Sequence, residues 1–485
     1  MTADAGQVWQ RLSPRMLLVH PVHEVLRQIP LLIGSVVLGS ATGNPMWTLF
    51  GLALIVGYGV ARWFTTTYRI DTEEVQLRTG VLQRKVLSVP RNRIRSVSTD
   101  ARLLHRLLGL TVLRVSTGRE ARPDAAFALD AVEADQVPRL RAILLADSLA
   151  PAEEAPAAPD RELARWQPSW LRYSPLSFTG LAMIAAAVGV VYQAGAGAAL
   201  QNSRLARSGL DAAERFGVAA SVVVVAVAVL VVSVVLSVLR SLVTFGNLVL
   251  RRDADLLHLE HGLLRVREHT FDMRRLRGGT LREPLLVRLF GGARVDAVMT
   301  GVGGAGEASL LLPPCPRATA QAVLSDLIVR PDVVTGALQV HGRAATRRRW
   351  TRALALPAVL LVAMAVLYLR TPVWLWPMWA VLTVCCALLA VDRSRALGHR
   401  VDAEWLVARA GSLDRRRDCI AAAGIIGWTV RQTLLQRRAG VATLIAATAA
   451  GVKSYRVIDV PAELAWTIAG SASPWVADSD WARTQ

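Results

Sequence analysis

The chain has 485 residues, of which 53% are hydrophobic, and a mean hydropathy of +0.37. It is too apolar for an ordinary soluble protein and long enough for several domains. Its formal charge of +19 would normally point to nucleic acid, but Lys85 and Lys453 are the only lysines among 56 basic residues. Such a skew toward arginine is typical of genome-wide codon bias, so we expect no nucleic acid partner.

The first apolar segment follows a mixed, polar N-terminal stretch that does not have the pattern of a cleaved signal peptide. Between Arg27 and Arg62 lie 34 consecutive uncharged residues, interrupted by Gly43-Asn44-Pro45. This tripeptide favours a turn, which predicts two helices of about 17 residues each, near the lower limit for a hydrocarbon core of roughly 30 Å. A single long helix plus a loop is the alternative.

An internal repeat begins after this segment. Val75 and Leu77 alternate with polar residues before Gly80, which predicts a strand ending in a turn. A second glycine follows 29 positions later, and the same step returns twice, as Gly80 to Gly109, Gly262 to Gly291 and Gly411 to Gly440. Each copy also has Leu-Leu before its second glycine and an arginine three residues before it. An internal repeat is the interpretation, against coincidence in a chain of few residue types.

The rest of the chain alternates apolar runs with further copies of the repeat. Runs of 31 and 24 uncharged residues precede the second copy, and runs of 17 and 21 precede the third. A proline- and alanine-rich linker follows the first copy, and an amphipathic or short helix closes each copy. The pattern predicts six membrane spans and ten segments: an N-terminal cytoplasmic segment (1–27), hairpin 1 (28–61), domain 1 (62–150), a linker (151–172), hairpin 2 (173–239), domain 2 (240–335), a basic juxtamembrane segment (336–352), hairpin 3 (353–391), domain 3 (392–470) and a tail (471–485).

Charge predicts the orientation of these segments. Each hairpin crosses the membrane an even number of times, so all three domains and both termini lie on one side. The connecting turns contain four of the 56 basic residues, Arg204, Arg207, Arg215 and Arg370. By the positive-inside rule, the domain side is the cytoplasm, and the chain is expected to be a multi-pass protein of the plasma (inner) membrane.

The first copy resembles a known family. Tyr68-Arg69-Ile70-Asp71, Thr79-Gly80, residues 91–97 and residues 103–110 are similar to bacterial pleckstrin-homology (PH) domain proteins of the YdbS/YdbT membrane type. The resemblance implies three all-β, PH-like sandwich domains, each closed by a C-terminal helix and alternating with helical membrane hairpins. It also implies a scaffold at the inner membrane, in envelope stress or antimicrobial resistance, with a shorter single-domain relative as a partner.

The motifs do not indicate an enzyme. No Ser-His-Asp order or paired carboxylates stand out, and the spans contain no internal acid, histidine or arginine, which transport chemistry usually requires. His258 and His261 point to opposite faces of a strand, so we expect no metal site. We expect no cofactor. A membrane enzyme or transporter with an unrecognised site is the alternative.

Basic residues follow the first glycine of every copy. At similar fold positions they could face anionic lipid head groups or an acidic protein partner, each adding about 1 kcal/mol near a charged leaflet. A solvated basic surface is the alternative interpretation. The candidate binding residues are Arg84, Lys85, Arg91, Arg93, Arg95, Arg265, Arg267, Arg274, Arg275, Arg277, Arg415, Arg416 and Arg417.

Overall fold

A computed structural model describes residues 9–16, isolated positions from 46 to 61, most of 63–145, and then 161–176, 218–301, 309–367 and 372–477. The residues between 62 and 145 that are not described are 62, 72, 81–83, 92–93, 95, 102 and 117–126. The chain divides into two compact units. The first unit holds the first repeat and the first half of the second, and the second unit holds the rest of the second repeat and the third.

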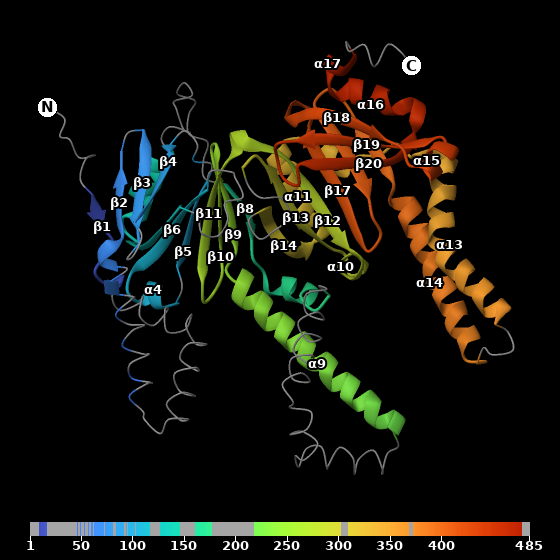
Figure 1. Cartoon of the computed structure of the whole chain (residues 1–485), viewed down its shortest axis with the longest axis horizontal. Coiled ribbons are helices and arrows are strands. Elements are labelled where there is room, and N and C mark those ends of the chain that lie inside the picture. The colour runs from blue at the N-terminus through green and yellow to red at the C-terminus, as the bar shows by residue number, and fades with distance from the viewer. Residues whose placement is uncertain are drawn as a thin grey trace. The chain divides into compact units, whose positions relative to one another are not determined.

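The first repeat consists of two antiparallel sheets and a closing helix (Figure 1). Its first sheet has the order β1-β2-β3-β4, and its second half contributes β5, β6 and β7. The short helix α4 contains the repeated Leu-Leu, and α5 closes the repeat. The elements are β1 (Gln10–Arg11), β2 (Thr67–Ile70), β3 (Glu74–Thr79), β4 (Lys85–Pro90), β5 (Ser96–Ala101), α4 (Leu103–Leu107), β6 (Leu110–Ser116), β7 (Phe127–Glu133) and α5 (Val137–Leu145).

One apolar core joins these elements. Val75 on β3, Leu113 on β6 and Leu144 on α5 are all fully buried in the same cluster. Alternation places one face of each strand toward this core, as the period of two requires. Two sheets and a closing helix around one core form the sandwich that the sequence predicts for this repeat.

The first three strands of the second repeat, together with strand β8 that precedes the repeat, extend the second sheet of the first repeat. Strands β5 and β11 pair antiparallel, which gives a seven-stranded sheet in the order β7-β6-β5-β11-β10-β9-β8. The added elements are β8 (Arg161–Arg165), β9 (Val249–Asp253), β10 (Leu256–His261) and β11 (Val266–Asp272). Residues 151–172 are therefore not a linker throughout, because Arg161–Arg165 pairs with β9 and satisfies the backbone groups along its edge.

The second unit contains a corresponding arrangement. Strand β12 of the second repeat pairs with β17 of the third, in a six-stranded sheet of order β14-β13-β12-β17-β16-β15. Helix α10 lies between β12 and β13, and helices α11 and α12 follow β14. The short helix η4 (Met273–Arg275) ends the first unit's part of the second repeat. The elements in this part of the second unit are η3 (Pro168–Tyr173), β12 (Leu276–Pro284), α10 (Leu285–Leu289), β13 (Gly292–Met299), β14 (Leu310–Pro316), α11 (Arg317–Ile328), α12 (Pro331–Thr335), β15 (Gly398–Val401), β16 (Trp405–Ala410) and β17 (Asp414–Ala421).

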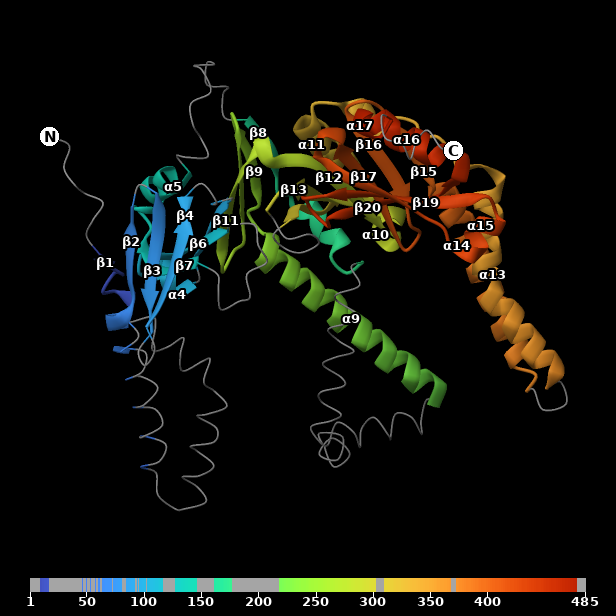
Figure 2. The same ribbon diagram turned by 45° about the horizontal axis from the view of Figure 1, so that its top comes forward.

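The third repeat ends in a three-stranded sheet of order β18-β19-β20. Leu406 on β16, Leu444 on β19 and Ala469 on α16 are fully buried in one core, so this repeat is also a sandwich closed by a helix. Its remaining elements are η7 (Ala422–Gly424), β18 (Ile425–Arg431), α15 (Leu434–Arg438), β19 (Val441–Thr448), β20 (Ser454–Pro461), η8 (Ala462–Leu464), α16 (Ala465–Ala472) and α17 (Pro474–Ala477). Figure 2 shows α16 and α17 beside these strands.

Two helices of the second unit are long and apolar enough to cross a membrane. They are α13 (Gly342–Val366) and α14 (Leu375–Ala396), and they correspond to the predicted third hairpin. Only 11% and 6% of their most apolar windows are buried by other parts of the protein. The indole N–H of Trp379 donates to the Pro357 carbonyl at 2.9 Å and ties one helix to the other.

The other four predicted spans have a different outcome. Most of hairpin 1 and the first helix of hairpin 2 lie outside the described residues. The second helix of hairpin 2 is present as α9 (Val218–Phe245), but its described apolar part, Leu230–Phe245, is shorter than a span. Among the described residues, two of the six predicted spans are therefore found.

The repeated glycines mark two turns whose backbone requires glycine. Gly262 has φ +109° and Gly411 has φ +104°, and a Cβ at either position would lie 2.1–2.2 Å from the carbonyl oxygen three residues ahead. Positive φ recurs at the second glycine of each copy as well. The periodic glycines are thus explained by turn geometry, as the sequence predicts.

Candidate functional site

The first place where predicted binding residues meet is the junction between β5 and β11. Both side-chain carboxylate oxygens of Asp100 accept hydrogen bonds from Arg265, one of them at 2.5 Å, and Asp100 is only 4% exposed. Burial alone would raise the pKa of Asp100, but the hydrogen bonds and charge of Arg265 outweigh it, and the pKa is lowered. Arg265 therefore compensates a buried charge.

A second ion pair reinforces the same junction. Arg141 on the closing helix α5 pairs with Glu268 on β11 at 2.5 Å, and Glu268 also accepts a hydrogen bond from Thr99 at 3.3 Å. The closing helix of the first repeat is thereby tied to a strand of the second. These contacts hold two repeats together.

The junction between β12 and β17 uses different chemistry. The Arg417 guanidinium is buried and donates to the carbonyl oxygens of Val333 at 2.9 Å and Gly336 at 2.8 Å. Beside it, the Thr280 hydroxyl donates to Asp418 at 2.7 Å. Burial raises the pKa of Asp418 to about 6, so this carboxyl has the opposite shift to Asp100.

The remaining basic candidates have mixed environments. Arg91 donates to the Ile143 carbonyl in the last turn of α5 at 2.5 Å, Arg275 donates to the Ile94 carbonyl at 3.1 Å, and Arg415 pairs with Asp392 at 2.6 Å. Three further candidates have half-buried side chains: Arg265, Arg267 and Arg277. Four candidates have exposed side chains: Arg84, Lys85, Arg274 and Arg416. Arg93 and Arg95 lie outside the described residues.

Sequence reasoning missed the acids that hold the third hairpin to its domain. Asp459 is completely buried and pairs with Arg348 at 2.5 Å and Arg349 at 2.8 Å, both on α13. Asp392, near the end of α14, accepts from Arg288 at 2.8 Å. Two of the three arginines in the juxtamembrane cluster are therefore used in packing, and the third, Arg347, is exposed.

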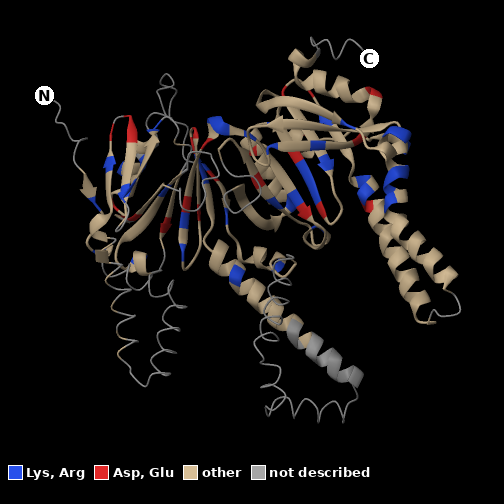
Figure 3. Ribbon diagram, viewed as in Figure 1, with Lys and Arg blue, Asp and Glu red and all other residues tan. Residues whose placement is uncertain are grey.

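A basic pocket lies at the domain end of the third hairpin. It has a volume of about 600 Å³ and is lined by Arg343 and Arg347 from α13 and by Arg395 from α14. All three arginine side chains are exposed. Figure 3 shows basic residues gathered at this end of the two helices, while their remaining length has none. The pocket therefore places positive charge at the domain end of the two apolar helices.

Burial lowers the pKa of two histidines at this pocket, His341 in its lining and His399 next to it. His341 Nδ1 donates to the Ile458 carbonyl at 2.8 Å, which leaves its Nε2 to accept from His399 Nδ1 at 3.0 Å. Burial lowers the pKa of His399 to about 4. The positive charge of the pocket near neutral pH thus comes from its arginines.

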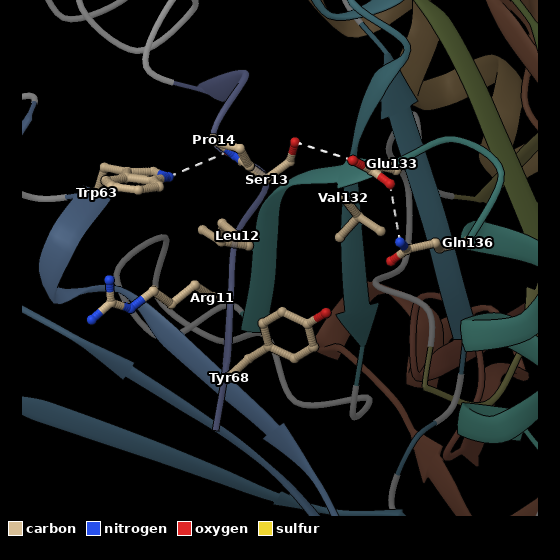
Figure 4. Close-up of a pocket in the computed structure, with 9 residues that line it drawn as sticks. All are labelled: Arg11, Leu12, Ser13, Pro14, Trp63, Tyr68, Val132, Glu133 and Gln136. Carbon is tan, nitrogen blue, oxygen red and sulfur yellow. Dashed lines mark hydrogen bonds between the residues drawn. The ribbon is translucent and has the colours of Figure 1, made fainter. Parts of the chain in front are cut away.

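A smaller cavity of about 380 Å³ lies in the first repeat (Figure 4). Ser13 and Gln136 donate to the Glu133 carboxylate at 3.4 and 3.0 Å, and the Trp63 indole donates to the Ser13 carbonyl at 3.3 Å. Burial and the nearby Glu133 raise the pKa of Tyr68, which lines the same cavity. The acid here is satisfied by neutral donors of its own repeat, so the cavity offers little to an anion.

The histidines on β10 and β11 do not gather around a metal-binding geometry. His258 bonds Thr270 at 3.1 Å, whereas His261 bonds the Thr244 carbonyl at 2.8 Å and stacks on His269. Among the described residues there is no group of three or more potential metal ligands.

Comparison with known families identifies the class of protein. A family model described as a bacterial PH domain matches residues 24–148 and 351–470, which together make up just over half of the chain. The chain belongs to the bacterial PH domain family. The two matches cover the first and third repeats, and each begins before the strands, within or ahead of the preceding apolar segment. No curated protein and no solved structure gives a significant match.

Proposed function

We propose that this protein is a non-enzymatic, membrane-anchored scaffold that binds anionic lipid head groups at the inner membrane through the basic pocket of its third hairpin. Its three PH-like repeats and both termini lie in the cytoplasm. The observation that carries the proposal is the position of Arg343, Arg347 and Arg395, which line one pocket at the root of two apolar, largely uncovered helices.

The physical argument has two parts. Helices with so much exposed apolar surface are stable in a bilayer, whereas in water such a surface would drive association. Once they span the membrane, their domain end lies at the head-group level, where each basic residue contributes about 1 kcal/mol toward an anionic surface. A phosphate in the pocket could accept bonds from several guanidinium groups.

The test uses the full-length protein in mild detergent, with phosphatidylglycerol and phosphatidylcholine as the probes. Native mass spectrometry would count retained lipid for the parent, for the triple variant Arg343→Gln, Arg347→Gln, Arg395→Gln, and for a matched control. The control replaces Arg437, Arg438 and Arg456, three exposed arginines of the same unit, with glutamine.

We expect the pocket variant to retain less phosphatidylglycerol and the control to match the parent. Added salt should weaken the parent's binding, because exposed charges are screened within about 8–10 Å at physiological ionic strength. Equal retention by the pocket variant and the control would refute the pocket as the lipid site.

Orientation and the absence of enzymatic activity require separate tests. A periplasm-active reporter that works when fused at residue 120, 300 or 450 would refute the cytoplasmic placement. Turnover or solute flux by the purified protein, above that of an unrelated membrane protein, would favour the alternative of a membrane enzyme or transporter.

A further inference from the structure

Among the described residues, the third repeat has an unpaired strand edge at the position where each of the first two repeats has a neighbouring strand. The fourth strand of the first repeat, β5, pairs with the third strand of the second, β11. The fourth strand of the second repeat, β12, pairs with the third strand of the third, β17. The fourth strand of the third repeat, β18, is the outer strand of its sheet.

The two existing junctions share one register. When residues are counted from the repeated glycines, Ser96 and Gly278 occupy the same position, 13 residues before the second glycine of their copy. Their partners, Phe271 and Ile420, also occupy one position, nine residues after the first glycine. The repeat therefore specifies which residues face each other, and the corresponding position of β18 is Gly427.

Residues on β18 are more exposed than the equivalent residues on β5 and β12. Thr280 on β12 is 6% exposed, whereas Thr429, the same residue type at the same repeat position, is exposed on β18. Asp100 is 4% exposed, and its equivalent Arg431 is exposed. Ile426, on the same open strand, is 68% exposed.

The short helix after each fourth strand has the same asymmetry. The repeated arginine contacts the next repeat in the first two copies: Arg106 donates to the Leu263 carbonyl at 2.9 Å, and Arg288 pairs with Asp392 at 2.8 Å. Arg437, the third member, is exposed, and no ion pair is formed by it within the described part of the chain. In the first two repeats, the fourth strand and the short helix after it therefore form a surface that binds the next PH-like unit.

We propose that β18 and α15 form a docking edge for the third strand of a bacterial PH domain carried by a different chain. The new strand would add antiparallel to β18 in the register of the two existing junctions. The position nine residues after its first glycine would face Gly427. The inference extends the proposed scaffold role to a protein partner, but it does not depend on lipid binding.

Charge argues against a second copy of this chain as the occupant. In the shared register, Lys85 on β4 of a second copy would face Arg431, and like charges directly opposite on a sheet are destabilising. At the first junction this position pairs Asp100 with Arg267.

The second junction contains two arginines at this position, but acids flank both. Arg282 lies 2.8 Å from Asp296, and Arg416 lies 2.9 Å from Asp414. The equivalent positions around Arg431 and Lys85 are Ile445 and Gln83, which are uncharged. A fitting partner strand therefore has an acid five residues after its first glycine.

The test converts β4 into such a strand and uses the full-length protein, with Cys385 and Cys386 replaced by serine. One preparation carries Thr429→Cys, and a second carries Leu87→Cys together with Lys85→Glu. Thr429 and Leu87 face each other in the shared register, so mixing the two preparations under mild oxidation should give a disulfide-linked pair. Replacing a repulsive pair with an attractive one should raise the yield about tenfold over the same mixture with Lys85 retained.

Two controls make the result specific. Val86→Cys in place of Leu87→Cys offers an exposed thiol one residue out of register, and its cross-link should be weak because neighbouring side chains point to opposite faces. Adding Arg431→Glu to the first preparation should abolish the gain from Lys85→Glu.

Failure of the Lys85→Glu mixture to cross-link, or equal yields at positions 86 and 87, would overturn the docking edge. Strong cross-linking with Lys85 retained would overturn the charge argument and make a second copy the occupant. None of these outcomes changes the lipid-retention test, so each proposal can fail alone.

Discussion

The two strand junctions join repeats with the same backbone register but with different side-chain chemistry. At β5–β11, Asp100 is compensated by the full charge of Arg265. At β12–β17, the buried Arg417 is compensated by two carbonyl oxygens, and Asp418 is hydrogen-bonded to a hydroxyl. Strand pairing is thus kept by the backbone and the repeat spacing, while each junction has its own way of satisfying the polar groups that it buries.

The largest effect should come from breaking the ion pair of the first junction. Asp100→Ala leaves Arg265 without its buried partner, and we expect the free energy of unfolding to fall by about 3 kcal/mol. Chemical denaturation in detergent would measure the change. Asp71→Ala is the control, because its pair with Arg69 lies within one repeat and is one-third exposed, and its loss should cost less than about 1 kcal/mol. Equal losses would show that the junction carries no special stability.

The second junction can be tested with two adjacent arginines. Arg417→Gln removes a charge-assisted contact to two buried carbonyl oxygens and should cost about 2 kcal/mol. Arg416→Gln removes an exposed pair with Asp414 and should cost less than about 1 kcal/mol. Thermal unfolding of the two variants would compare them, and a larger effect at Arg416 would contradict the structure.

The junctions should respond to pH in opposite directions. The pKa of Asp100 is lowered by folding, so its contribution to stability is present above about pH 4 and is lost as the pH falls. The pKa of Asp418 is raised to about 6, so its contribution is present at low pH and is lost as the pH rises through 6. Asp418→Asn should therefore remove a loss of about 1 kcal/mol between pH 5 and 7. Hydrogen exchange of β12 and β5, measured from below pH 4 up to pH 7, would separate the two effects, and parallel slopes would refute the assignment.

The smallest difference concerns the two threonines. Thr280→Val removes the 2.7 Å bond to Asp418 and should cost about 1 kcal/mol, because few other donors reach that carboxyl. Thr99→Val removes a 3.3 Å bond to Glu268, which keeps its pair with Arg141, and should cost less. Thermal unfolding measured side by side would rank them, and the reverse order would contradict the comparison.

Much of the fold could be predicted because it is recorded in local patterns. The glycine spacing marked turns that need positive φ, the alternation of Val75 and Leu77 marked a strand, and long uncharged runs marked α13 and α14. The match to a bacterial PH domain confirms the family for the first and third repeats. The prediction of three such domains, like the cytoplasmic orientation, stays a prediction.

The environments of the basic residues could not be predicted from local sequence patterns. Arg415, Arg416 and Arg417 are one run in the sequence, yet one pairs with Asp392, one is exposed and one is buried against carbonyl oxygens. Alternation along a strand separates neighbours, and the environment of each depends on residues far away in the chain. The pocket arginines were missed for the same reason, because Arg395 lies about 50 residues from Arg343 and Arg347.

The sequence by itself determined the repeat, its turns and its apolar helices, because each depends on residues within a few positions of one another. Only the tertiary structure decided that β5 pairs with β11 and β12 with β17, so that repeats share sheets. Strand pairing between repeats joins residues about 130–175 positions apart, and no local periodicity in the sequence indicates it. The unpaired edge of β18 is likewise recognised only from the tertiary structure, because the equivalent strands of the other two repeats each pair with a strand of the next repeat.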